Sequence, residues 1–195
     1  DLLLEFQKKN DPPMGLPAIC YTDEKFWNIE CDTLLADGWM FVGFAHELNK
    51  SGDVMPIEVA GKPILLVKNL KGEIVAFHNV CRHRCLKLVD QSKNVGKLIR
   101  CPYHSWAYDL DGALRASPHF GGTNLHQPKG FNVRNYGLQS VNVTTWHDWI
   151  FINLNGNAPP FKKYAAKLIK QLGDCNFDKI LPVATLEFGE IFTNW

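Results

Sequence analysis

The sequence has no long hydrophobic run and no excess of charge of either sign. Its longest apolar stretches, 63–67 and 149–154, fall far short of the roughly 20 residues that a bilayer-spanning helix needs. The 21 Lys and Arg residues nearly balance the 20 Asp and Glu residues, which leaves a formal net charge of +1. Because no overall field would attract a polyanion or an acidic lipid surface, we expect neither a nucleic acid nor a membrane as a partner.

The chain also lacks an initiator Met and any basic segment followed by an apolar one, the arrangement that directs export. It begins Asp1-Leu2-Leu3, which indicates a fragment of a longer protein rather than an exported one. We therefore expect a cytoplasmic location. In that reducing compartment the six Cys residues are expected to remain thiols or to bind metal rather than to form disulfides.

The 195 residues are enough for a buried core, and 46% of them are hydrophobic. Between residues 39 and 155, short apolar runs alternate with Gly, Asn and Asp, a pattern typical of an antiparallel sandwich or barrel. The predicted strands are 39–44, 54–59, 63–68, 74–77, 97–101, 139–145 and 150–154. Turn signals at 69–72 and at Asp111-Gly112 predict two tight connections, the second closing a hairpin between 106–108 and 113–115.

Helical patterns lie on both sides of this β-rich region. We expect a helix from Asp23 to Gly38, capped by Thr22, with an apolar stripe through Trp27 and Leu34 that faces the core. A second helix is expected over 161–172, after Pro159-Pro160. The run 183–192 predicts a last strand.

Two short segments carry the chemistry. Cys81-Arg82-His83 and Cys101-Pro102-Tyr103-His104 each supply one thiolate and one imidazole, with residues 84–100 between them. A structural zinc site usually takes one pair as C-x2-4-C and the other as H-x3-5-H. Here each segment mixes the two ligand types, as a binuclear iron cluster requires when one iron takes two Cys and the other two His. The candidate metal ligands are Cys81, His83, Cys101 and His104.

These residues resemble the Rieske [2Fe-2S] motif, C-x-H followed by C-x2-H, and Pro102, Trp106 and Tyr108 support the match. The wider stretches 79–84 and 101–112 resemble the N-terminal domain of the large (alpha) subunit of ring-hydroxylating Rieske non-haem iron oxygenases. The resemblance implies a mainly β, antiparallel Rieske fold of small stacked sheets with flanking N- and C-terminal helices. It also implies three parts: an N-terminal extension with a helix (1–38), the Rieske domain (39–155), and the helix and first strand of an incomplete catalytic domain (156–195).

By the same resemblance, Cys81 and Cys101 bind one iron, and His83 and His104 bind the other. The chain departs from the family at Cys85 and Ser105, which stand where Gly is usual. Respiratory Rieske proteins form a disulfide from the position of Cys85, but Tyr103 occupies its partner's place, so Cys85 is expected to be a free thiol. A reduction potential at the low end of roughly −150 to +300 mV is implied, since the hydroxyl donors of the respiratory type are not evident.

The function implied is electron transfer, as the N-terminal part of an oxygenase that inserts oxygen from O2 into an organic substrate. Such a parent holds a mononuclear Fe(II) through two His and a carboxylate, in a catalytic domain that this chain lacks. The family also implies a reductase or ferredoxin as electron donor and a homotrimeric parent. The substrate would be an aromatic ring or a quaternary amine.

Two alternatives remain open on the sequence. One is a free-standing Rieske-type ferredoxin, although such a protein needs only about residues 39–154. The other is a zinc-stabilised binding module with no redox role.

Overall fold

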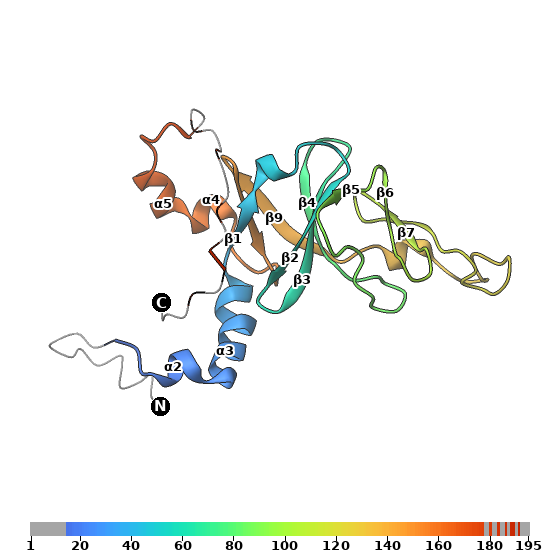
Figure 1. The fold of residues 1–195 in the computed structure, drawn as a ribbon, viewed down its shortest axis with the longest axis horizontal. Coiled ribbons are helices and arrows are strands. Elements are labelled where there is room, and N and C mark those ends of the chain that lie inside the picture. The colour runs from blue at the N-terminus through green and yellow to red at the C-terminus, as the bar shows by residue number, and fades with distance from the viewer. Residues whose placement is uncertain are drawn as a thin grey trace.

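The computed structural model describes residues 15–177 together with residues 180, 183, 186, 188, 189 and 191. Within these residues the chain forms two antiparallel sheets and several short helices (Figure 1). This confirms the predicted mainly β, antiparallel class. No helix among the described residues is both long and apolar enough to cross a membrane.

The larger sheet has seven strands in the order β1-β10-β9-β4-β3-β2-β5. The smaller sheet has the order β6-β7-β8. The strands of the larger sheet are β1 (Met40–Phe44), β2 (Asp53–Val59), β3 (Lys62–Lys68), β4 (Ile74–His78), β5 (Lys93–Asn94), β9 (Ser140–Trp146) and β10 (Trp149–Asn153), and those of the smaller are β6 (Leu98–Arg100), β7 (Ala107–Asp109) and β8 (Leu114–Ala116). Every predicted strand before residue 155 corresponds to one of these, and only the two-residue β5 had no sequence signal.

Strand β3 lies between two hydrophobic cores. Its residues Ile64–Val67 are all fully buried, which explains why this strand reads as a continuous apolar run instead of alternating. Leu65 and Val67 join the core that also contains Cys81, Cys101 and Trp106. Ile64 and Leu66 face the second core, together with side chains of β9 and β10. Strand β3 is therefore covered on both faces, and the first of the two cores contains two of the candidate ligands, Cys81 and Cys101.

Both predicted turns are confirmed. Asn69, at the β3–β4 turn, is buried, and its Oδ1 accepts the backbone N–H groups of Lys71 and Glu73. At the β7–β8 turn, Asp109 Oδ1 accepts the N–H groups of Asp111 and Ala113. In both turns a side-chain oxygen thus accepts backbone N–H groups that have no partner strand to bond.

The N-terminal helical segment comprises α2 (Ile19–Thr22), α3 (Glu24–Glu30) and the wider π-helical turn η1 (Cys31–Leu35). The predicted cap at Thr22 is wrong, because Thr22 ends α2 and Asp23 instead accepts the N–H of Phe26 at 2.8 Å. The predicted inward stripe, which also includes Cys31 and Leu35, is confirmed only in part: Cys31 is buried and Leu35 half-buried, but Trp27 is 43% and Leu34 67% exposed. Periodicity placed these side chains on one face of the helix but did not specify what that face would contact.

The second helical segment is divided, contrary to the prediction of one helix. It comprises α4 (Phe161–Tyr164) and α5 (Ala166–Gln171), and the backbone leaves the helical region at Ala165, with φ −89° and ψ 13°. Phe161 packs against the rings of Trp39 and Phe151, which holds α4 on the sheet. The apolar spacing is satisfied by both pieces, so it gave no signal for the break. Half of the residues of the predicted strand 183–192 lie outside the described residues.

Two short 3-10 helices, η2 (Ala45–Glu47) and η3 (Val133–Tyr136), complete the fold. The buried amide of Asn153 donates to the carbonyls of Ala36, Asp37 and Gly38, at 2.9 to 3.1 Å, and so attaches the end of the N-terminal helical segment to β10. In Figure 1, α3, α4 and α5 gather at one end of the molecule, and β6 and β7 lie at the other. The candidate ligands belong to this second end.

Candidate metal centre

Two turns, 81–86 and 101–106, carry the four candidate ligands. The first follows β4, and the second joins β6 to β7. In each turn the N–H four residues after the Cys donates to the carbonyl of that Cys, from Cys85 at 3.0 Å and from Ser105 at 3.1 Å. In each, the N–H of the Cys donates to the carbonyl five residues later, at 2.8 Å in both cases. The two turns therefore share one hydrogen-bonding pattern although their sequences differ.

The shared conformation explains why Gly is usual at two positions of the motif that the sequence resembles. Cys85 has φ 54° and Ser105 has φ 57°, so both lie in the left-handed region that favours Gly. Both side chains are exposed, and Cys85 is a free thiol as predicted. The turns tolerate a Cβ at these positions at a conformational cost, because the side chains point to solvent.

The thiols of the two turns form a buried pair. Cys81 is 1% and Cys101 2% exposed. Burial is the main reason that the pKa of the Cys101 thiol is raised, and the adjacent Cys81 thiol adds to the effect. The backbone N–H groups of Tyr103 and His104 hydrogen-bond Cys101 and act in the opposite direction. A thiolate here thus has donors from its own turn but little access to water, which favours its neutralisation by a metal.

Tyr108, on β7, connects the second turn to the first. Its hydroxyl oxygen accepts the N–H of Arg82 at 3.0 Å and lies 3.3 Å from Cys81 Sγ. Because that N–H occupies an acceptor position, the hydroxyl proton is available to the sulfur. Burial raises the pKa of Tyr108, so the hydroxyl keeps this proton.

No hydroxyl donor of the respiratory type was evident in the sequence, but the structure places the hydroxyl of Tyr108 beside a candidate ligand. The sequence marked Tyr108 only as part of the motif. No local pattern brings it to a Cys that lies 27 residues earlier, and the contact depends on the pairing of β6 with β7.

The imidazoles form a second pair. The rings of His83 and His104 have centroids 4.7 Å apart and meet edge to face. His83 also stacks on the buried indole of Trp106, with centroids 4.8 Å apart and planes 5° from parallel. Burial first, and then the neighbouring His104 and Arg84, lower the pKa of His83. Each of these effects favours the neutral imidazole, the form that binds metals.

His104 has a nitrogen without a protein partner. Its Nδ1 is buried and makes no hydrogen bond to any residue that the structure describes. Tyr103 lies against the ring, with centroids 3.7 Å apart. Since a buried polar atom without a partner is costly, a ligand for this nitrogen is expected, and a metal ion is the usual one for a neutral imidazole.

The four side chains thus lie as a pair of thiols and a pair of imidazoles. Within the described part of the chain, no three His, Cys, Asp or Glu side chains converge as they would around one metal ion. The two pairs match the ligand set of a [2Fe-2S] cluster in which each iron takes two like ligands, and the Nδ1 of His104 supplies a nitrogen that needs a partner. The residues present therefore fit such a cluster.

Other His residues have structural contacts of their own. His46 Nδ1 contacts the carboxylate of Asp148 in the β9–β10 turn. His126 Nδ1 accepts the N–H of His119, whose own Nδ1 accepts the N–H of Asn124. These contacts hold loops together and add no ligand to the two pairs.

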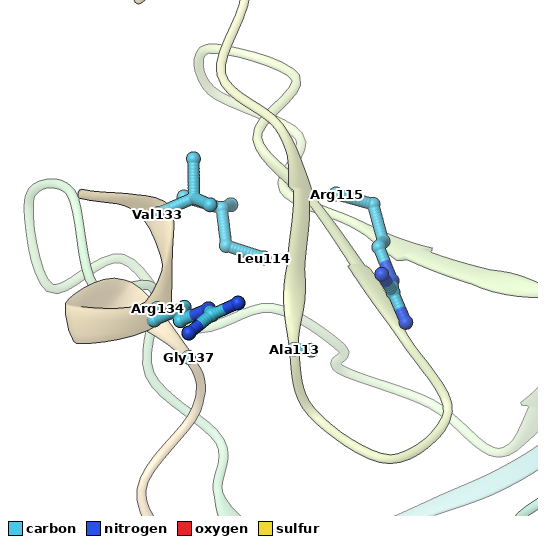
Figure 2. Close-up of a pocket in the computed structure, with 6 residues that line it drawn as sticks. All are labelled: Ala113, Leu114, Arg115, Val133, Arg134 and Gly137. Carbon is cyan, nitrogen blue, oxygen red and sulfur yellow. The ribbon is translucent and has the colours of Figure 1, made fainter. Parts of the chain in front are cut away.

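A cavity of about 170 Å³ lies between β8 and η3, lined by Ala113, Leu114, Arg115, Val133, Arg134 and Gly137. Figure 2 shows Arg134 directed toward Leu114, and Arg115 on the opposite side of the strand. Arg115 pairs there with Asp109 at 2.7 Å. None of the four candidate ligands lines this cavity, so it is separate from the candidate centre.

Comparisons with known proteins agree with this geometry. Residues 38–137, which include both turns, match the family model described as "Rieske [2Fe-2S] domain". The glycine betaine monooxygenase oxygenase subunit of Pseudomonas aeruginosa is 33% identical over 83% of this chain and 36% of its own length. The carnitine monooxygenase oxygenase subunit of Acinetobacter pittii is 27% identical over 98% of this chain and 50% of its own length.

Among solved structures, the apo form of a quaternary ammonium Rieske monooxygenase superposes with a TM-score of 0.72 at 26% identity. That match covers 80% of this chain and 44% of the other. The chain therefore spans at most about half the length of the relatives that it matches.

Proposed function

Because this chain belongs to the Rieske [2Fe-2S] domain family, we propose that Cys81 and Cys101 hold one iron of the cluster and that His83 and His104 hold the other. The observation that carries this assignment is the pairing of thiol with thiol and imidazole with imidazole by two turns of the same conformation. When bound, a [2Fe-2S] cluster with this ligand set supplies reversible one-electron transfer at roughly −150 to +300 mV.

The residues around the ligands shield the His83 side of the site from solvent and leave the His104 side accessible. The buried Trp106, with Phe120 and Phe131 packed edge to face against it, covers one face of His83 and keeps water from it. On the other side His104 is half-buried and Tyr103 is 58% exposed. We propose that a redox partner approaches at His104, because electron transfer needs a short path from the site to the surface.

We further propose that the parent protein is an oxygenase that inserts oxygen from O2 into an organic substrate. We favour a quaternary amine over an aromatic ring because several relatives named for glycine betaine or carnitine match 83% to 100% of this chain, whereas the biphenyl 2,3-dioxygenase subunit alpha of Rhodococcus jostii, 30% identical, matches 74% of it. In this proposal a mononuclear Fe(II), held by two His and one carboxylate, belongs to the part of the parent that this chain does not include.

The remaining proposals concern organisation. We propose residues 1–38 as an N-terminal extension, 39–155 as the Rieske domain, and 156–195 as the beginning of the catalytic domain. A reductase or ferredoxin would supply electrons in the cytoplasm, and the parent would be a homotrimer. The relatives' names describe oxygenase subunits, which supports a system with a separate electron-donating component.

Metal and sulfide analysis of the freshly purified chain tests the central proposal. We expect two irons and two acid-labile sulfides per chain, little zinc, and a visible spectrum that bleaches with dithionite. One zinc and no sulfide would instead support a zinc-stabilised module. The Cys81→Ser and His104→Ala variants should lose the cluster, whereas Cys85→Ser, at an exposed thiol four residues from Cys81, should keep it.

The proposed parent activity has a separate test. The full-length protein, combined with its reductase, should consume O2 in the presence of glycine betaine or carnitine and not in the presence of biphenyl. Consumption with biphenyl alone would overturn the quaternary amine proposal and leave the cluster assignment intact.

A further inference from the structure

Asn79 lies at the base of the first ligand turn and is completely buried, with 0% of its surface exposed. Its side-chain amide makes three hydrogen bonds. The Nδ2 group donates to the carbonyl of Val89 at 2.7 Å, and Oδ1 accepts the N–H groups of Leu88 at 3.2 Å and Val89 at 3.1 Å. One side chain thus joins the two ends of the segment 79–89, which contains Cys81 and His83.

The same residue also fixes that segment to the sheet. The backbone N–H of Asn79 donates to the carbonyl of Pro63 on β3 at 2.8 Å. One residue further along, Val80 pairs with Lys87 in an isolated β-bridge. Asn79 is therefore the point where the first ligand turn meets the rigid core of the molecule, two residues before the Cys81 thiol.

The partners of the Asn79 side chain differ in what they lose without it. The Leu88 N–H also lies 3.4 Å from the backbone carbonyl of Asn79 and keeps that acceptor. Val89 is buried, and its N–H and carbonyl both bond the Asn79 amide, so they cannot turn to water without moving the backbone. Removing the amide therefore loosens the segment at Val89, and we expect Cys81 to be held less firmly against β7, which carries Tyr108.

We propose that Asn79 is a positioning residue for the iron-sulfur site: its amide closes the segment 79–89 and so holds the Cys81 sulfur against the Tyr108 hydroxyl. This inference rests on the proposed function, because it takes Cys81 and His83 as ligands. A hydrogen bond to a ligand sulfur raises the reduction potential of a cluster. Loss of the Asn79 amide, which weakens the hydrogen bond from Tyr108 to Cys81, should therefore lower the potential and speed loss of the cluster.

The chain offers two matched controls. Asn69 and Asn153 are also buried, and each of their amides hydrogen-bonds at least three groups of the backbone or of other side chains. Asn69 closes the β3–β4 turn, and Asn153 attaches the N-terminal helical segment to β10. All three amides have a comparable structural task, but only that of Asn79 closes a segment that carries candidate ligands.

The experiment compares Asn79→Ala, Asn69→Ala and Asn153→Ala in the cluster-containing chain. All three should unfold at lower temperature. Only Asn79→Ala should also lower the midpoint potential, shift the g-values of the reduced protein in electron paramagnetic resonance, and lose its visible absorbance roughly tenfold faster in the presence of a chelator. Asn79→Ser keeps one hydroxyl for this hydrogen-bonding and should lie between Asn79→Ala and the unchanged chain.

Equal potentials, g-values and absorbance loss in Asn79→Ala and Asn69→Ala would overturn the inference and leave Asn79 with a structural role only. If Asn79→Ala does not fold, the same comparison is made with Asn79→Ser against Asn69→Ser. Failure of the proposed function is distinct, because the unchanged chain would then contain no iron and no sulfide.

Discussion

At the scale of single residues, the contact between Tyr108 and Cys81 has the clearest consequence. The hydroxyl lies 3.3 Å from the sulfur and is fixed by the N–H of Arg82. A reduced cluster carries more negative charge on its sulfurs than an oxidised one, so a donor to Cys81 stabilises the reduced state.

Tyr108→Phe should therefore lower the midpoint potential without loss of iron. One hydrogen bond of about 1 kcal/mol corresponds to a decrease of roughly 40 mV for a one-electron couple. Protein-film voltammetry measures this change. Tyr136→Phe is the matched control, because Tyr136 packs on Trp106 without contacting either Cys among its described interactions. An unchanged potential in Tyr108→Phe would show that the hydroxyl does not donate to Cys81.

The left-handed residues of the two turns lead to a second prediction. Cys85→Gly and Ser105→Gly should each raise the unfolding temperature, because the positive φ costs an L-residue roughly 1 kcal/mol that Gly does not incur. For a chain of this size that corresponds to an increase of about 2 to 4 °C. Cys85→Ala and Ser105→Ala keep the Cβ and should show no such gain. If the Ala and Gly variants melt together, removal of the polar side chain is the cause instead.

At the scale of elements, the β7–β8 hairpin depends on close contact with β4. Gly112 has φ 85°, and a Cβ there would come within 2.5 Å of Phe77 Cε1. Phe77 belongs to the core that surrounds the candidate ligands. The turn at Asp111-Gly112 thus needs Gly for two reasons, its conformation and its proximity to a buried ring.

Gly112→Ala should destabilise the chain more than Gly72→Ala. Gly72 has a similar φ of 79° but open space around the position of a Cβ, so its substitution isolates the conformational cost of roughly 1 kcal/mol. Gly112→Ala adds a clash, for which we expect at least about 1 to 2 kcal/mol more. Denaturant unfolding of the two variants measures the difference. Equal destabilisation would mean that Phe77 moves aside without cost.

At the scale of the whole molecule, the two ligand turns come from different sheets. The first follows β4 of the seven-stranded sheet, and the second lies between β6 and β7 of the three-stranded sheet. A cluster bound by both turns links the two sheets, and because it binds the folded chain alone it stabilises that chain.

Removal of iron should therefore loosen the small sheet in particular. We expect chelation under reducing conditions to lower the unfolding temperature by about 10 °C or more and to speed amide exchange in β6, β7 and β8. Amides of β9 and β10, in the other core, should change least. Uniform acceleration across both sheets would mean that the cluster supports the whole fold rather than the junction.

Much of this protein could be read from residues close together in the chain. Alternating and continuous apolar runs predicted the strands, Asp111-Gly112 predicted a hairpin, and the C-x-H and C-x2-H spacings singled out four candidate ligands. These features depend on backbone preference and on ligand type, which are local properties. The same local signals predicted one helix over 161–172 and a cap at Thr22, whereas the helix divides at Ala165 and Asp23 provides the cap.

The sequence by itself determined which residue types can bind a metal, and that they come in two mixed pairs. The family resemblance implied that Cys would pair with Cys and His with His, and the structure brings these side chains together. Only the tertiary structure decided that Tyr108 reaches Cys81 and that Asn79 closes the first segment. The physical reason is separation along the chain. Each of these contacts joins residues 10 or more positions apart, except for the Asn79 bond to Leu88, and forms only when the register of the sheets brings them together.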